Sequence, residues 1–360
     1  MRYAHIDFLR AALMIGGIIV HSATLALQPS PFYSAIFYIS SLFRMETFFI
    51  ISGFLTALTC SKYGYSIAIK NRLIRIGIPL FFGLIILNPI TNQLVYLYHN
   101  EGIEKYTLNL YFKNNHAANG PMVWHLHLWF LFPLIFYAFF LRPIDKLASN
   151  NFLKQYIKDL DDKNNIYIVI LILSLATLSV LLRIFYTQII VNFFNFEFSF
   201  LLREILYQFP YYLFGFILFK YKGAYKIFHT PSWCLFACLT TIVIVFNENN
   251  PFNNVFLKSA ELMVYAITSY SIANILFYLS ERSLPKHSNI ISFYASASYT
   301  IYMMHYLVIY AIALSFKSFF ENENIFIAFC AVITFIITTL IHKHMVSDKR
   351  ILPIFLNGKI

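Results

Sequence analysis

Long apolar stretches recur along the whole chain, separated by short polar segments. Each stretch is close to the roughly 20 residues that an α-helix needs to cross a bilayer. We predict spans at residues 6–28, 37–59, 76–98, 122–141, 166–185, 200–219, 231–246, 255–280, 291–316 and 325–342. The pattern therefore predicts an all-α integral membrane protein with about ten transmembrane helices.

The composition supports the same class of protein. Hydrophobic residues make up 59% of the chain and charged residues 12%, and the mean hydropathy is +0.65. A soluble domain needs more charges than this to cover its surface. The most polar segments, 99–121 and 142–165, are too short to form domains of their own. We therefore expect one polytopic membrane domain over residues 1–360.

The positive charges are distributed unevenly between the two sides of the predicted membrane. If the N-terminus is cytoplasmic, the cytoplasmic segments carry 19 of the 27 Lys and Arg residues, and the opposite loops carry four. The other four lie inside or at the edge of the spans. This bias predicts that both termini are cytoplasmic. The net charge of +11 then reflects topology and contact with anionic membrane lipid, and it does not indicate nucleic acid.

A cleaved signal peptide is an alternative interpretation of the first stretch, because Arg2 precedes it and small residues follow at 23–26. The apolar stretch is long for a signal peptide, and Asp7 interrupts the basic region that should precede it. Removal would also leave an odd number of spans. We therefore expect the first stretch to be a membrane span.

The sequence predicts no metal site. His125 and His127 would point in different directions on an α-helix, because two residues turn it by about 200°. Four cysteines lie in or beside apolar stretches without the spacing of zinc ligands. They are Cys60, Cys234, Cys238 and Cys330. We expect them to pack inside the protein and to form no disulfides.

Ionisable residues occur inside the first span, where they are costly in hydrocarbon and usually mark a polar cavity. Arg10 and His21 are eleven residues apart, which is about three helical turns, or roughly 16 Å along the axis. Asp7 lies three residues before Arg10, on the same face. The span therefore presents a carboxylate, a guanidinium and an imidazole on nearly one face of the helix.

The second span carries Arg44 and Glu46, which diverge by about 200° around a helix and cannot simply neutralise each other. Each is expected to find a partner on another helix. Ser52 and Gly53 should allow a neighbouring backbone to come close. Alternatively, the two charges extend to the membrane surface or only serve packing, since Arg44 lies near the outer end of its helix.

Two arginines, Arg72 and Arg75, precede the third span, and on an α-helix they would share one face. Paired guanidinium groups bind phosphate well. The alternative is that they are ordinary flanking charges on the cytoplasmic side of a span.

The fourth and ninth spans contain further polar and aromatic residues. Trp124 and Trp129 suit either the membrane interface or a platform on which a sugar ring stacks. Tyr302 and His305 should share a helix face. The simpler interpretation of His305 is a buried side chain hydrogen-bonded to a neighbouring helix.

These motifs together resemble the acyltransferase-3 family of multispanning membrane O-acyltransferases. The resemblance rests on Asp7-x-x-Arg10-x10-His21, Phe-Phe-x-x-Ser-Gly-Phe at 48–54, Arg72-x-x-Arg75, His-Leu-Trp-Phe-Leu at 127–131 and Tyr302-x-x-His305. Phe43-Arg44-Met45, just before the second motif, is similar to the glucan-biosynthesis branch, which adds succinyl groups to periplasmic glucans.

The resemblance implies that acyl-CoA in the cytoplasm donates an acetyl or succinyl group to a hydroxyl of an extracytoplasmic glycan, at the bacterial inner membrane and without another cofactor. Arg10 and His21 match the family's essential pair, and Arg72 and Arg75 match its proposed donor-binding pair. His21 would act as a base or as a covalent acyl carrier, and Arg10 would orient the donor or polarise a carbonyl. Supporting roles fall to Asp7, Arg44, Glu46, Ser52, Trp129, Tyr302 and His305.

Two departures from the family bear on the acceptor. Many members have an acidic residue after the span-four Trp, where this chain has apolar residues at 132–135. It also lacks an esterase-like domain, so we expect the membrane part, or a partner protein, to complete the transfer. The main alternative function is a secondary transporter that uses Asp7, Arg10 and His21 for coupling, but we find no duplicated halves. A lipid-interacting scaffold would have less reason to keep these charges in hydrocarbon.

Overall fold

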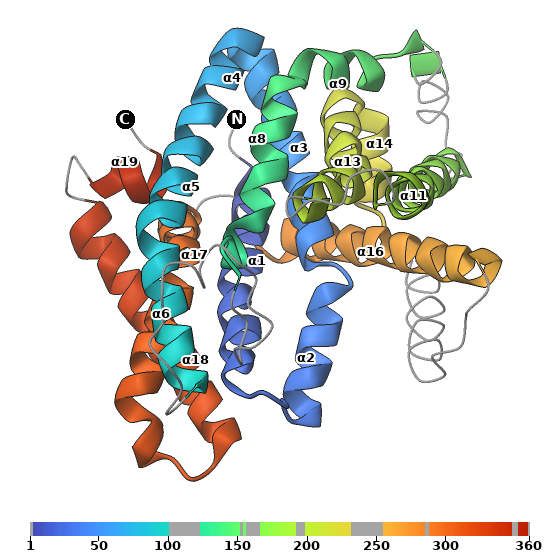
Figure 1. The fold of residues 1–360 in the computed structure, drawn as a ribbon. Helices are drawn as coiled ribbons and strands as arrows, with labels where there is room; N and C mark the ends of the chain where they lie inside the picture. Colours follow the sequence, from blue (N-terminus) through green and yellow to red (C-terminus); the bar gives the residue numbers. More distant parts are fainter. Residues whose placement is uncertain are drawn as a thin grey trace. The chain divides into compact units, whose positions relative to one another are not determined.

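A computed structural model describes residues 3–100, 123–151, 154–155, 166–191, 199–231, 255–284, 288–347 and 352–358. The described residues form helices and connecting segments, with no β-strand among them (Figure 1). They fall into two compact units. The first unit comprises Met1–Leu9, Ser41–Lys70 and Phe132–Lys286, and the second comprises Arg10–Ser40, Asn71–Leu131 and His287–Ile360.

Within these ranges, seven helical segments are long and apolar enough to cross a membrane, or eight if one bent pair is also a span. The seven are Ala4–Leu25, Pro31–Tyr63, Tyr65–His99, Ile168–Ile190, Lys258–Ser283, Asn289–Phe319 and Glu323–Val346. The prediction of an all-α, multi-pass membrane protein is confirmed. The predicted span at 231–246 lies almost entirely outside the described residues, and the count of ten spans, the orientation and the single domain stay predictions.

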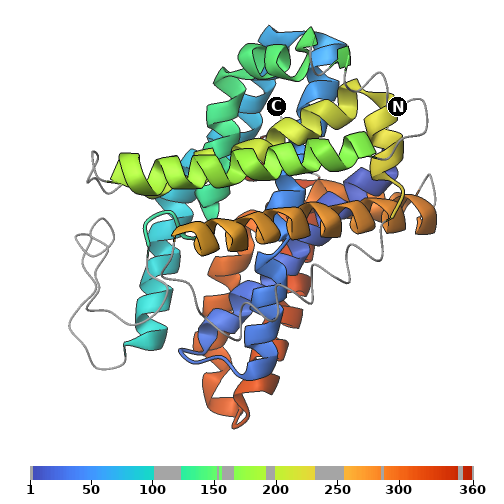
Figure 2. The ribbon, with the colours of Figure 1, turned by 90° about the vertical axis from the view of Figure 1, so that its right-hand side faces the viewer.

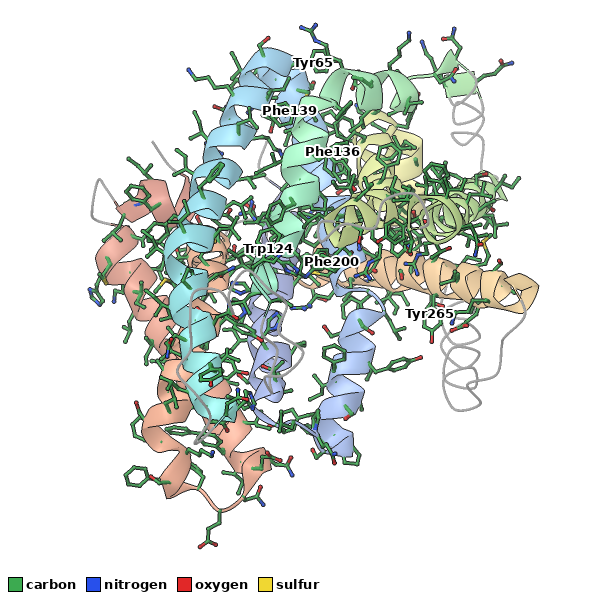
Figure 3. The ribbon with its side chains drawn as sticks, viewed as in Figure 1. Tyr65, Trp124, Phe136, Phe139, Phe200 and Tyr265 are labelled. Atoms are coloured by element: carbon green, nitrogen blue, oxygen red, sulfur yellow. The ribbon has the colours of Figure 1, made fainter. Side chains whose placement is uncertain are left out.

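Large apolar side chains project outward from the spans. Phe81 and Ile85, one turn apart, are 66% and 69% exposed. Phe136 and Phe139 of α8 are exposed in the same way (Figure 3). Because exposed apolar surface is unfavourable in water and favourable in hydrocarbon, these positions suit contact with lipid tails.

The first unit is organised around helix α13 (Ser199–Lys220). It packs against α3 (Arg44–Tyr63) and α11 (Ile166–Phe185), and α11 also packs against α16 (Val255–Ser283) (Figure 2). A Cβ atom on Gly53 would lie 2.0 Å from the Tyr212 carbonyl oxygen, and one on Gly215 would lie 2.0 Å from the Ile50 carbonyl oxygen. The two glycines therefore allow α3 and α13 to touch backbone to backbone, which confirms the expectation for Gly53.

Helix α13 occupies the predicted span 200–219 but is not among the seven apolar segments. Arg203, Glu204 and Gln208 occupy its N-terminal half and lower its hydropathy. Two shorter helices, α9 (Leu141–Ala148) and α14 (Lys222–Phe228), also pack against it.

The second unit is organised around α17 (Asn289–Phe316), which packs against α18 (Glu323–Ile341) and α6 (Asn88–His99). The predicted third span is one helical run. It begins with α4 (Tyr65–Arg72), continues through a π-helical turn at Leu73–Gly77, α5 (Ile78–Phe82) and a second π-helical turn at Gly83–Leu87, and ends with α6. Helix α1 (Ala4–Ser22) enters this unit at Arg10, and α2 (Pro31–Ser41) follows it.

The fourth predicted span differs from a regular α-helix. It begins with a 3₁₀ helix, η4 (Leu126–Phe130), continues as α8 (Leu131–Phe139) and bends by 77° into α9. Leu126 adopts a left-handed backbone conformation with φ of 43°. The α-helical geometry assumed for His125 and His127 is therefore wrong, because a strained turn and a tighter helix replace it.

Candidate functional site

Three histidines from three segments meet in the second unit, and we call them the histidine cluster: His21 of α1, His127 of η4 and His305 of α17. The ring centroids of His127 and His305 are 4.7 Å apart, those of His21 and His305 5.1 Å, and those of His21 and His127 6.1 Å. Tyr306 lies 5.1 Å from His21 and stacks on His127 at 5.3 Å. His21 and His305 are candidate site residues on two different predicted spans, and the structure brings them together. It also places His127 beside them.

Arg10, like His21, contacts α17, but ten residues nearer the start of that helix. Its Nη2 atom donates a hydrogen bond to the backbone oxygen of Ala295 on α17, at 2.9 Å. The two contacts, Arg10 with Ala295 and His21 with His305, show that α1 and α17 run in the same direction. An odd number of crossings must then separate these helices, and the sequence predicts seven. Arg10 and His21 themselves stay roughly 16 Å apart along α1.

The backbone around His127 is held by side chains from two helices. Asn88 and Asn92 of α6 donate to the backbone oxygens of Trp124 and Val123, at 2.9 Å and 3.2 Å. The Tyr302 hydroxyl of α17 donates to the backbone oxygen of His127. These contacts stabilise the left-handed Leu126, a conformation that costs roughly 1–3 kcal/mol. Such strained positions are frequent at functional sites.

Hydrogen bonds define the tautomer of one member of the histidine cluster. His305 Nδ1 lies 2.6 Å from the backbone oxygen of Tyr302, which only accepts, so Nδ1 carries a proton. In the neutral ring, Nε2 is then the basic nitrogen. His305 is 1% exposed, so its orientation is set by packing as well as by this bond.

His127 differs from its neighbours because neither ring nitrogen has a hydrogen-bond partner among the described residues. Its side chain is buried, at 5% exposure. A buried polar group without a partner costs roughly 1–3 kcal/mol. A ring kept in this state, in contact with two other imidazoles, is the exception among buried polar groups that marks a candidate site.

A hydroxyl network lies beside His21 at the end of α1. The Thr24 Oγ1 atom donates to the backbone oxygen of His21 at 2.6 Å. The Tyr310 hydroxyl lies 3.1 Å from Thr24 Oγ1 and 3.1 Å from His99 Nε2. The network connects α1, α17 and α6 at this level and holds the end of the helix that carries His21.

The arginine pair, Arg72 and Arg75, lies at a distance from the histidine cluster. Arg72 ends α4, and Arg75 is exposed within the π-helical turn that follows. The wider π turn rotates the two side chains further apart than the α-helical spacing predicts. Asn88, at the level of the cluster, comes sixteen residues after Arg72, or roughly 24 Å along the helical run.

The C-terminal segment packs against the arginine pair. Helix α19 (Leu352–Asn357) contacts α5 and the π-helical turn, and Gly358 follows it with φ of 56°. A Cβ atom on Gly358 would lie 2.2 Å from the Cα atom of Arg75, so only glycine fits there. The backbone at Arg75 is therefore covered on one side, while its side chain stays exposed.

Four predicted supporting residues belong to the first unit: Asp7, Arg44, Glu46 and Ser52. Glu46 is buried, with the favourable charges of Arg183 on α11 and Arg44 on its own helix and the like charge of Glu204 on α13 around it, so the expected partners on other helices stay a prediction. The Ser52 backbone oxygen accepts a hydrogen bond from Thr56. These residues build the packing of the first unit, whereas the histidine cluster belongs to the second.

The tryptophans flank His127 along the chain. Trp124 lies just before η4 (Figure 3), its ring centroid 5.2 Å from that of His125, and Trp129 is half-buried within η4. A role for Trp129 in stacking on a sugar stays a prediction.

His127, Asn88 and Asn92 were not predicted as site residues. A signal was present for the asparagines, because two amides at i and i+4 inside an apolar run share a helix face and need polar partners. An α-helix would point His127 away from His125, so the sequence alone does not predict a site there. The 3₁₀ turn that makes it a neighbour of His305 depends on contacts from α6 and α17.

Comparison with known proteins agrees with the resemblance. The acyltransferase domain of the acyltransferase-3 family matches residues 3–343. The chain is 26% identical to glucans biosynthesis protein C of Shigella dysenteriae serotype 1 over 324 residues. This match covers 84% of this chain and 80% of that protein. The protein of the same name from Escherichia coli O157:H7 is 25% identical over the same shares. No solved structure matches the chain significantly. The chain therefore belongs to the acyltransferase-3 family and is a multi-pass membrane acyltransferase.

Proposed function

We propose that this acyltransferase moves an acetyl or succinyl group from cytoplasmic acyl-CoA to a hydroxyl of an extracytoplasmic glycan, at the bacterial inner membrane. The observation that carries the proposal is the histidine cluster around His21, at a level roughly 24 Å along the helical run from Arg72. An enzyme that takes a donor from one side and an acceptor from the other needs such a separation.

The arginine pair is proposed to bind the donor. Arg72 and Arg75 can contact the phosphates of CoA from the cytoplasmic side, where the predicted topology places them. The roughly 24 Å from Arg72 to the level of the cluster then has to be covered by the extended arm of the donor. Acyl-CoA is a long molecule with its phosphates at one end and its thioester at the other, and it suits this layout.

The histidine cluster is proposed to carry the chemistry. His21 takes the proton of the acceptor hydroxyl, the hydroxyl oxygen attacks the thioester carbonyl, the carbon–sulfur bond breaks, and the CoA thiolate then takes a proton. In the alternative route, His21 attacks the thioester first and the acyl-imidazole is then attacked by the hydroxyl. His305 and His127 lie beside His21, with ring centroids 5.1 Å and 6.1 Å from it, where they can contact the donor or the acceptor in either route.

Arg10 is proposed to orient the donor. The roughly 16 Å between Arg10 and His21 is too far for both to contact one carbonyl group. Its hydrogen bond to Ala295 holds the guanidinium ten residues along α17 from His305, at the level where Asn357 bonds to Ser296 and Gly358 abuts Arg75. That position suits a contact with the donor's arm better than a contact with the reacting oxygen.

The glycan acceptor is inferred from the names of the relatives, which are glucans biosynthesis proteins. Trp129, two residues after His127, is proposed to stack on a sugar ring of the acceptor. The direct test is mass spectrometry of periplasmic and surface glycans from cells with and without this protein. Loss of acetyl or succinyl groups on deletion, restored by a plasmid copy, is expected, and identical glycans in both cells would overturn the proposal.

A further inference from the structure

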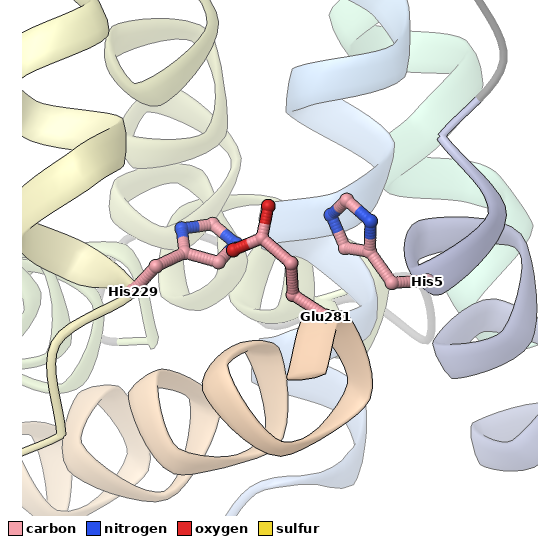
Figure 4. A group of neighbouring side chains, drawn as sticks. All are labelled: His5, His229 and Glu281. Carbon is pink, nitrogen blue, oxygen red and sulfur yellow. The ribbon is translucent and has the colours of Figure 1, made fainter. Parts of the chain in front are cut away.

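Three metal-binding side chains converge in the first unit, from segments far apart in the sequence. They are His5 in the first turns of α1, His229 just after α14, and Glu281 near the end of α16. One potential ligand atom from each lies within 4.8 Å of the other two. Figure 4 shows the two imidazole rings on either side of the carboxylate. No short sequence motif joins these residues, so the sequence predicted no metal site here.

The ring of His229 is oriented as a metal ligand. Its Nδ1 atom lies 2.7 Å from the backbone oxygen of Tyr225, so Nδ1 carries a proton and Nε2 presents a lone pair. Nε2 lies 3.7 Å from Glu281 Oε2, too far for a hydrogen bond, and has no other hydrogen-bond partner among the described residues. Metal-binding histidines usually donate their other N–H to a carbonyl in this way.

His229 is also buried. Its side chain is 8% exposed, so packing holds the ring in the orientation that the bond to Tyr225 sets.

Tyr225 connects the two histidines. Its hydroxyl lies 2.9 Å from His5 Nε2, while its backbone oxygen accepts from His229. The rings of His5 and His229 meet edge to face, with centroids 5.7 Å apart. Tyr225 thus contacts both rings, and for His5 Nε2 to bind an ion its hydroxyl has to turn away from that nitrogen.

We propose that His5, His229 and Glu281 bind one divalent transition-metal ion, with Zn²⁺ as the ion to test. Two neutral imidazoles and a carboxylate form a donor set found in zinc sites that keep a fourth position open. In a tetrahedral site, ligand bonds of about 2.0–2.2 Å place the ligand atoms roughly 3.3–3.6 Å apart. The carboxylate has to move inward to reach this geometry, and the Glu281 side chain, 47% exposed, has room to do so.

The bound ion would connect the beginning of α1 to α14 and to the end of α16, all within the first unit. The predicted topology places these three positions at cytoplasmic ends of helices, where metal ions are accessible. None of the three residues belongs to the histidine cluster or to the arginine pair.

The test uses the full-length protein, purified in detergent without a polyhistidine tag and treated with a chelator. We expect isothermal titration with ZnCl₂ to show one Zn²⁺ per chain. His229→Gln and Glu281→Gln should each weaken binding by at least about tenfold, since each removes one of three ligands. The matched control is His344→Ala, which removes an exposed histidine outside the site.

Thermal unfolding separates a metal site from a simple ion pair. Zn²⁺ should raise the Tm of the wild type and of His344→Ala more than that of Glu281→Gln at the same concentration, because the stabilisation of the folded state falls as the affinity falls. Glu281 is half-exposed, so this variant should fold. The proposal is overturned if Zn²⁺ neither binds to nor stabilises the wild type, or if both Gln variants bind it as the wild type does.

Discussion

The ring centroids of His21 on α1 and His305 on α17 lie 5.1 Å apart. Eleven residues earlier on α1, Arg10 donates to the backbone of Ala295, ten residues before His305. These two contacts set the register of α1 along α17, and they place one imidazole against another inside a membrane protein. A half-buried imidazole against a buried one is an arrangement suited to acid–base chemistry.

Replacing His21 should abolish catalysis and spare the fold. We expect His21→Ala to lower acyl transfer by about 10²-fold or more, since general base catalysis is typically worth that much. The side chain is only half-buried, so the Tm should change little. Glycan acylation in cells and the Tm of the purified protein are the measurements, with His344→Ala as the control. Full acylation in cells that contain only His21→Ala would remove His21 from the mechanism.

His127 allows a sharper test, because its ring is buried without a hydrogen-bond partner among the described residues. His127→Phe keeps an aromatic ring beside Tyr306 and removes the unsatisfied polar atoms. The Tm should stay the same or rise, because the unpaired group costs roughly 1–3 kcal/mol. Acyl transfer should fall nevertheless. Unchanged turnover in this variant would show that His127 serves packing alone.

The Tyr302 hydroxyl should matter for turnover more than for donor binding. Tyr302→Phe removes its hydrogen bond to the His127 backbone, at a cost of roughly 0.5–1.5 kcal/mol. We expect kcat to fall while the affinity for CoA is unchanged, because the bond positions η4 rather than the arginine pair. Tyr299→Phe is the matched control on the same helix, since the Tyr299 hydroxyl has no partner within the described ranges. Equal kinetics in the two variants would contradict the prediction.

The arginine pair should bind the donor electrostatically. Substituting both Arg72 and Arg75 by Gln should weaken CoA binding, and the difference from wild type should shrink as salt is added. Isothermal titration of CoA at two salt concentrations measures this. Lys343→Gln, at another exposed cationic position predicted to be cytoplasmic, should bind CoA as the wild type does. If the double variant retains full affinity, the arginines only mark topology.

The contact between α3 and α13 should tolerate no side chain at Gly53. In Gly53→Ala the new Cβ would lie 2.0 Å from the Tyr212 carbonyl oxygen, so the helices must separate, at a cost of about 1–3 kcal/mol. Gly16→Ala is the control, because nothing lies within 4 Å of its Cβ position. That change should be neutral or stabilising, since Ala favours helix by up to about 1 kcal/mol over Gly. Equal Tm values for the two variants would show that the close contact is absent.

The sequence by itself determined the class of protein, most of the helices and the family. In a bilayer every backbone N–H and C=O group must bond within its own segment, so a long apolar stretch is helical whatever surrounds it. The spacing of Arg10 and His21 on α1 follows from the same local rule.

Only the tertiary structure decided which of the polar residues inside the predicted spans lie next to one another. His127 joins His21 and His305 because Asn88, Asn92 and Tyr302 hold a 3₁₀ turn that local helix geometry does not predict. His5, His229 and Glu281 converge from three segments that share no motif. The physical reason is that helix formation depends on neighbours along the chain, whereas the faces that come together depend on packing between helices distant in sequence.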